Sequence, residues 1–272
     1  MDSRERADSD EREGGGERAD SRRDGPHGAA VVAEDFGLKG ARGWAFRHVH
    51  VDAAPGTVIV IEGPSGSGRT CLLLALTGRM RPTEGRAEIA GLPLPRAMAG
   101  VRRISGLGHV PGVSDLDPAL TVAEHLRERA LLQSRFGGSP RALLRPRARR
   151  TAEARDRIDA ALTAAGLHTS ALPKGERTAV RDLERLEALR LSVALALIGR
   201  PRLLAVDDLD LKLSDADRAE AWRLLGSVAK AGTTVLAVCG QAPEGADAAV
   251  RDTVIRTNEE GAADALAETG RA

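Results

Sequence analysis

Three short runs of apolar residues without polar interruption predict the centre of the fold. Val58 to Ile61, Arg202 to Val206 and Thr233 to Val238 are rich in β-branched or aliphatic side chains and show no period-two alternation. Strands that are buried on both faces of a parallel sheet have this pattern. Thr70 to Thr77, closed by Gly78, has the composition of a helix that follows the first strand. The sequence therefore predicts an α/β fold with a mainly parallel sheet.

Shorter β segments lie around this centre. Ala29 to Ala33, Trp44 to Val51 and the Gly- and Pro-rich stretch from Arg86 to Pro95 predict an N-terminal antiparallel layer. Val254 and Ile255 predict a last edge strand.

The middle of the chain changes to helical periodicity. Leucine and alanine recur at helical spacing in Thr121 to Ser134 and Thr151 to Gly166, and Gly137, Gly138 and Pro140 separate the two segments. A further helix is expected from Leu186 to Gly199. We expect a helical insertion between two halves of the sheet.

Both ends of the chain are polar. Residues 1–28 contain no large aliphatic or aromatic side chain after Met1, and we expect a disordered charged tail there and a polar tail over 258–272. Lys+Arg 40 against Asp+Glu 39 gives no basic field of the kind that marks nucleic-acid binding. Cys71 and Cys239 lack the spacing of a metal site or a disulfide framework. No apolar run reaches the ~18 residues of a membrane span, so membrane helices are expected from a partner.

The segment between the first strand and its helix has the glycine spacing of a phosphate-binding loop. In such loops backbone N–H groups converge on an anion at the positive end of a helix. Taken alone, a Gly-rich turn is weak evidence, but the strand from Arg202 brings Asp207 to the same edge of the sheet, where it can hold Mg²⁺ through water opposite the Thr70 hydroxyl. The candidate nucleotide-binding residues are Gly63, Pro64, Ser65, Gly66, Ser67, Gly68, Arg69, Thr70 and Cys71.

With these motifs in order, the chain resembles the ATP-binding subunit of an ABC transporter. The resemblance covers about residues 29–257 and rests on the phosphate loop, on "LGHVPGVSDLDPALTVAEHL" from Leu107, and on "VRDLERLEALRLSVALALIGRPRLLAVDD" from Val180. It implies a P-loop NTPase fold of ABC type with a helical subdomain at about 113–190. It also implies ATP and Mg²⁺ as cofactors, a homodimer or a heterodimer with another ATP-binding subunit, and a separate transmembrane permease. The chain would then be cytoplasmic and held at the inner face of the membrane by that permease.

Several positions depart from the family's pattern. Arg69 replaces the loop lysine, and its planar guanidinium is wider than an ammonium group. Gly112 and Gly240 stand where the family has a glutamine that joins Mg²⁺ and a switch histidine. Asp208 takes the place of the glutamate that orients the attacking water, and it is one methylene shorter. The family's signature loop caps the partner's γ-phosphate, and it aligns with Leu183, Glu184, Arg185, Leu186 and Glu187.

These departures leave two functions open. The chain is expected either to hydrolyse ATP slowly and drive a membrane subunit, or to serve as a nucleotide-binding or scaffold subunit without appreciable turnover. The residue that stacks on adenine is also open between Trp44, Phe36 and neither of them. The six histidines are expected to have surface or packing roles.

Overall fold

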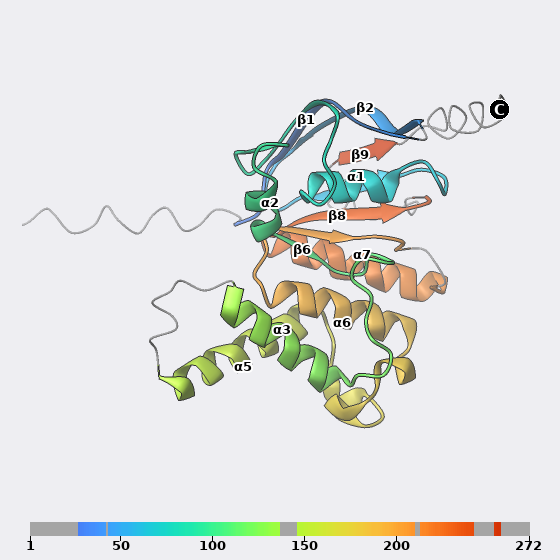
Figure 1. The fold of residues 1–272 in the computed structure, drawn as a ribbon. Helices are drawn as coiled ribbons and strands as arrows, with labels where there is room; N and C mark the ends of the chain where they lie inside the picture. The colour runs from blue at the N-terminus through green and yellow to red at the C-terminus, as the bar shows by residue number, and fades with distance from the viewer. Residues whose placement is uncertain (1–26, 42, 137–145, 210–212, 242–252, 257–272) are drawn as a thin grey trace, which may run out of the picture.

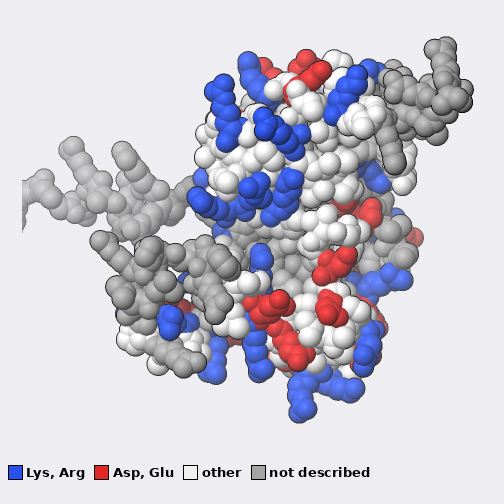
Figure 2. All heavy atoms as spheres, in the orientation of Figure 1, with Lys and Arg blue, Asp and Glu red and all other residues white. Residues whose placement is uncertain are grey.

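The computed structural model describes residues 27–41, 43–136, 146–209, 213–241 and 253–256. Two β-sheets lie above a group of helices in the view of Figure 1. On the face in Figure 2, Lys and Arg are spread over both the sheets and the helical part, and a group of Asp and Glu lies on the helical part. In the described part of the chain, no helix is long and apolar enough to cross a membrane.

The first sheet is antiparallel, as predicted, with the strand order β2-β1-β4-β5. The first strand is longer than the predicted segment 29–33, because it bends through irregular pairings with both neighbours and continues to Gly40. The strands are β1 (Val31–Gly40), β2 (Gly43–Ala53), β4 (Glu84–Ile89) and β5 (Leu92–Leu94).

The second sheet is parallel in every pairing and has the order β6-β7-β8-β3-β9. Its three central strands are the apolar runs that the sequence singles out, and the last strand lies at the edge beside β3, as predicted. The short first strand was not predicted. The strands are β3 (Val58–Glu62), β6 (Ser105–Leu107), β7 (Leu203–Val206), β8 (Thr234–Cys239) and β9 (Thr253–Arg256).

The parallel sheet is buried on both faces, which explains its lack of alternation. Val58, Leu204 and Val235 belong to one hydrophobic cluster with the helices below the sheet. Ile59 and Leu236 belong to a second cluster with the first helix and the antiparallel sheet. Because successive side chains of a strand point to opposite faces, consecutive positions inside these strands are apolar, and polar residues such as Glu62 and Thr234 stand only at the strand ends.

Helices cover both faces of the sheet. Two of them were not predicted: α2, which follows the antiparallel strands, and α7, which starts at the Ser214 N-cap. The α-helices are α1 (Arg69–Leu76), α2 (Met98–Ile104), α3 (Val122–Phe136), α5 (Arg147–Ala164), α6 (Arg185–Leu197) and α7 (Asp215–Lys230). Three 3₁₀ turns, η1 (Thr169–Ala171), η2 (Gly175–Arg177) and η3 (Val180–Asp182), connect α5 to α6. Helices α3, α5 and α6 lie below the sheets in Figure 1 and, with the 3₁₀ turns, form the helical insertion.

The predicted boundary of the N-terminal tail needs a correction of two residues. Arg202 donates from Nε to the carbonyl of His27 (2.9 Å) and from Nη2 to that of Gly28 (3.0 Å). A Cβ on Gly28 would lie 2.7 Å from backbone atoms of Gly56 and Gly232, so this residue is packed against the fold. The predicted tails over 1–26 and 258–272 lie outside the described residues.

Candidate functional site

The turn between β3 and α1 is shaped by two glycines with positive φ. Gly66 has φ 85° and Gly68 has φ 82°, in the left-handed region that favours glycine. A Cβ on Gly68 would overlap the carbonyl oxygen of Ala45 in β2, so the antiparallel sheet holds the loop from one side. Ser67 is buried and donates from Oγ to the carbonyl of Pro64 (2.8 Å), which closes the turn. The exposed residues Pro64 to Gly66 form its tip.

The N-terminus of α1 is open to an anion. Its N-cap is Gly68, which has no side chain to accept hydrogen bonds from the first turn. Nη1 of Arg69 is buried and has no hydrogen-bond partner in the described structure. Free first-turn N–H groups and a buried unpaired guanidinium nitrogen together suit a phosphate oxygen.

Thr70 and Asp207 meet across the carboxyl edge of the parallel sheet. The Thr70 hydroxyl donates to Oδ2 of Asp207 at 2.6 Å, although 137 positions separate the two residues. Asp207 is only 1% exposed, and its backbone N–H donates to the carbonyl of His109 (2.7 Å). The partly buried hydroxyl and the buried carboxylate provide oxygen donors of the kind that Mg²⁺ prefers, directly or through water. The sequence prediction that these two residues lie opposite one another agrees with this geometry.

Cys71 lies on the first turn of α1 and is half-buried. Burial raises the pKa of the Cys71 thiol, and the negative charge of Asp207 raises it further. The side chain is therefore a protonated thiol at neutral pH.

Asp208 follows Asp207 with φ 51°, and its backbone N–H donates to Oδ1 of Asp207 (2.9 Å). Its side chain lines a cavity of about 260 Å³ together with His109, Asp115 and Arg185. Apolar residues of η3, α6 and the segment around Leu116 complete the walls. Nothing in the sequence connects His109 with Asp208, because they come together only through the pairing of β6 with β7.

The segment aligned with the signature motif starts α6. Glu184 is the N-cap, and its side chain accepts a hydrogen bond from the backbone N–H of Glu187. Glu187 reciprocates, with Oε2 accepting from the backbone N–H of Glu184 (2.8 Å). This capping box uses the N–H groups of Glu184 and Glu187 internally and places two carboxylates at the start of the helix. Leu183 and Leu186 pack against the hydrophobic core as partly buried side chains, and Arg185 faces the Asp208 cavity.

The two glycines at the glutamine and histidine positions are exposed. Gly112 has φ 74° in a turn closed by its N–H donating to Oδ2 of Asp115 (2.8 Å). Gly240 directly follows β8. Neither position carries a side chain that can bind a metal or a phosphate.

The two aromatic candidates for adenine stacking differ in exposure. Phe36 is fully buried, with its ring centroid 5.7 Å from that of Phe46, so it is a core residue and cannot stack on a ligand. Trp44 is partly exposed at the start of β2, with Nζ of Lys39 5.5 Å from the ring centroid. It directly precedes Ala45, which contacts the glycine loop.

Residues 46–209 match a sequence family described as ABC transporter. The chain is similar to "Nod factor export ATP-binding protein I" of Cupriavidus metallidurans, with 31% identity over 189 residues, 70% of this chain and 55% of that protein. It is also similar to "Cytochrome c biogenesis ATP-binding export protein CcmA" of Bordetella parapertussis, with 32% identity over 214 residues, 77% of this chain and 83% of that protein. The chain thus spans about half the length of the Nod factor relatives that it matches.

Solved structures support the fold. A dimeric post-hydrolysis state of the ATP-binding cassette MJ0796, bound to ADP and Pi, matches with a TM-score of 0.62 at 21% identity, covering 84% of this chain and 94% of that one. The predicted fold class, with its parallel core, antiparallel layer and helical part, is confirmed.

Proposed function

Since the chain belongs to the ABC transporter family, we propose that it is an ATP-binding subunit that holds Mg-ATP on the loop between β3 and α1. The observation that carries this proposal is the combination of a helix N-terminus without a side-chain cap and the buried Nη1 of Arg69 beside it, which has no hydrogen-bond partner among the described residues. A phosphate chain supplies the negative charge and the acceptor oxygens that this end of the helix lacks.

In this proposal each side chain of the loop region has a defined task. Thr70 and Asp207 hold Mg²⁺, the first through its hydroxyl and the second through water, and the ion would neutralise charge on the phosphates. Arg69 donates to a phosphate oxygen, with planar geometry in place of the point charge of a lysine. Trp44 is the residue proposed to stack on adenine, since Phe36 is buried.

We propose that turnover is slow. Asp208 is assigned to orient the attacking water, with a carboxylate about one methylene short of the family's glutamate. No side chain at Gly112 or Gly240 assists it. In a dimer, the partner's phosphate would meet an α6 end that carries the carboxylates of Glu184 and Glu187, which already accept two of its backbone N–H groups. The self-capped end of α6 is also the observation that favours the second candidate function, a scaffold subunit that binds nucleotide without appreciable turnover.

The proposed setting follows from the relatives. The similar proteins are named as export ATP-binding proteins. We propose that this chain likewise works with a separate transmembrane permease, as a homodimer or with another ATP-binding subunit, at the inner face of the cell membrane.

Equilibrium binding of ATP, with and without Mg²⁺, tests the first part of the proposal. We expect Mg²⁺-dependent binding that Thr70→Ala reduces by about tenfold or more, because the hydroxyl and its carboxylate partner act together on the ion. Thr163→Ala, at an exposed threonine of α5, is the matched control and should bind like the parent. Absence of binding by the folded parent at millimolar ATP would contradict the proposal and favour a scaffold that does not use nucleotide.

A second experiment separates slow turnover from none. Phosphate release is measured in the complex with the permease for the parent and for the variant Arg69→Lys with Asp208→Glu. We expect the double variant to release phosphate faster, because the longer carboxylate reaches the attacking water. An unchanged rate would show that these two positions do not limit turnover.

A further inference from the structure

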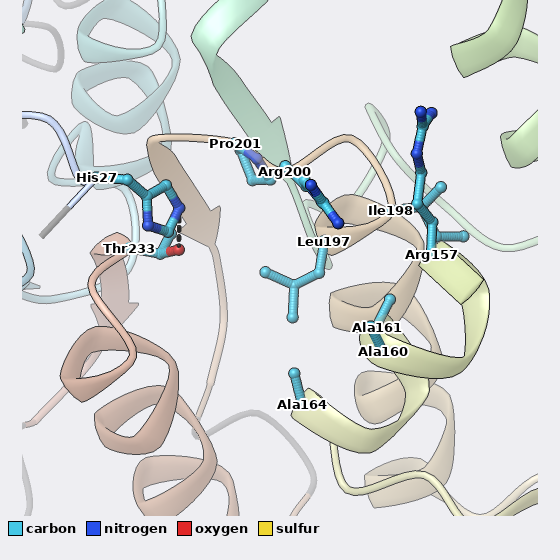
Figure 3. A pocket seen from close by; sticks show the side chains of 10 residues that line it. All are labelled: His27, Arg157, Ala160, Ala161, Ala164, Leu197, Ile198, Arg200, Pro201 and Thr233. Carbon is cyan, nitrogen blue, oxygen red and sulfur yellow. Dashed lines mark hydrogen bonds between the residues drawn. The ribbon is translucent and has the colours of Figure 1, made fainter. Parts of the chain in front are cut away.

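A second cavity of about 490 Å³ lies far from the glycine loop (Figure 3). Pro201 and Thr233, which line it, come just before β7 and β8. The glycine loop instead follows the end of β3. Because these strands are parallel, the cavity lies at the amino ends of the strands and the loop lies at their carboxyl ends. A ligand in this cavity does not compete with one on the loop for space.

Small and aliphatic side chains make up most of the cavity wall. One face of α5 contributes three alanines, and the end of α6 contributes two larger aliphatic residues. The members of this apolar wall are Ala160, Ala161, Ala164, Leu197, Ile198 and Pro201. The volume lies within the range of small-molecule sites, and such sites are commonly lined by apolar groups with a few polar ones.

The polar groups at the cavity are basic or neutral. Arg157 and Arg200 line it, and neither guanidinium forms an ion pair or a hydrogen bond with a described residue. His27 and Thr233 form the opposite side, with ring Nε2 and Oγ1 3.1 Å apart. No Asp or Glu is among the lining residues that the structure describes. The charge of the cavity therefore complements an anion.

Arg200 is the better placed of the two arginines. It follows Gly199 in the turn between α6 and β7 and has φ 48°, in the left-handed region that a non-glycine residue seldom adopts. From this turn its side chain extends toward the space beside Leu197, whereas the Arg157 guanidinium lies on the side away from His27 (Figure 3). The opposite wall is held in place by Arg202, which anchors the carbonyls of His27 and Gly28.

We propose that this cavity binds a free small amphiphile with an apolar body and one anionic head, such as a carboxylate or a sulfonate. The body contacts the alanine face of α5, and the head pairs with Arg200. Residues 1–26 contain no large apolar side chain after Met1 that could pack against the apolar wall. The chemistry of this segment therefore does not match the cavity, and we propose a free molecule as its occupant. The bound molecule touches both α5 of the helical insertion and the amino edge of the parallel sheet, and it links these two parts of the fold.

Fluorescence titration of the full chain with 8-anilinonaphthalene-1-sulfonate, and with its neutral analogue N-phenyl-1-naphthylamine, tests the proposal. We expect the anionic probe to bind saturably. Monomeric dodecanoate should displace it, whereas ATP should not. Arg200→Gln should weaken the anionic probe about tenfold and leave the neutral probe unchanged, since only the charged contact is lost. Arg103→Gln, at an exposed arginine of α2, is the matched control.

A cavity-filling variant tests the location. Ala164 is exposed at the cavity, so Ala164→Trp should fold and abolish binding of both probes, whereas Thr163→Trp on the neighbouring exposed position should not. Unchanged binding in Ala164→Trp would overturn the proposed site. Equal weakening of both probes by Arg200→Gln, or displacement by anionic phospholipid vesicles but not by monomeric dodecanoate, would overturn the proposed ligand.

Discussion

The N-termini of α1 and α6 have the same backbone dipole, but they differ in whether their hydrogen-bond donors are left for an external anion. The end of α1 has Gly68 as N-cap and no side-chain acceptor, and the buried Nη1 of Arg69 beside it has no hydrogen-bond partner in the part of the chain that the structure describes. The end of α6 is closed by Glu184 and Glu187, each of which accepts a backbone N–H of the other.

The difference shows that a helix end becomes an anion site only when the chain leaves its donors unused. At α1 the first-turn donors and a guanidinium remain for an external acceptor. At α6 two carboxylates already occupy that position, and a phosphate brought there would meet negative charge. We therefore expect the two ends to respond differently to substitution.

The largest effect is expected at Gly68, where an added methyl group collides with the backbone of β2. Gly68→Ala forces φ 82° on an L-residue and overlaps the Ala45 carbonyl, so we expect a loss of about 3 kcal/mol or more in unfolding free energy. Gly66→Ala is the control, because φ is also positive but nothing lies within 4 Å of the new Cβ, and it should cost only about 1 kcal/mol. Urea unfolding of both variants measures the difference. Equal losses would show that Ala45 does not constrain the loop.

Arg69 tests whether the unused donor at α1 serves a phosphate. Arg69→Ala should weaken ATP by about tenfold or more, since a hydrogen bond to a charged group contributes about 1.5–3 kcal/mol. Arg69→Lys should retain most of the affinity because the positive charge remains. Calorimetric titration with ATP compares the two variants. Parent-like affinity in Arg69→Ala would mean that the buried nitrogen does not contact the nucleotide.

At α6 the expected effect is on stability, not on nucleotide binding to the same chain. Glu184→Ala removes the cap and should lower the unfolding free energy by about 1 kcal/mol. Glu184→Ser keeps a capping oxygen without the charge and should stay close to the parent. Thermal unfolding separates them, and similar melting temperatures for all three chains would show that the capping box contributes little.

The smallest effect concerns Cys71 and pH. The pKa of the Cys71 thiol is raised in the folded chain above the ordinary value of 9.0. At pH values just above 9.0 the unfolded chain has therefore lost the thiol proton, whereas the folded chain still keeps it. Ionisation therefore favours unfolding in that window, and the stabilising contribution of the protonated thiol decreases as the pH rises through it. Alkylation of Cys71 by iodoacetamide, followed against pH without nucleotide, should have a midpoint above that of the unfolded chain. Asp207→Asn should lower the midpoint by removing the second cause, and an unmoved midpoint would exclude that carboxylate as a cause.

Much of the fold was predictable because its strongest signals are local. The three central strands are uninterrupted apolar runs, since both faces of their sheet are covered. The helices α3 and α5 were found from periodicity. Helix α7 was missed although Ser214 and Asp217 form a capping pair before an apolar stretch, a signal that the sequence does contain. Strand β6 has only three residues, too few to show a pattern, and depends on its pairing with β7.

The sequence by itself determined the order of the elements, the glycine loop and the missing side chains at positions 112 and 240, because each depends on residue type and near spacing. Only the tertiary structure decided that Thr70 lies 2.6 Å from Asp207, that His109 shares a cavity with Asp208, and that Phe36 is buried whereas Trp44 is partly exposed. It also decided that Arg157 and Arg200, beside the alanine face of α5, pair with no other residue that the structure describes. Such contacts join residues far apart in the chain, and their distances arise from strand pairing and packing, which no local pattern encodes.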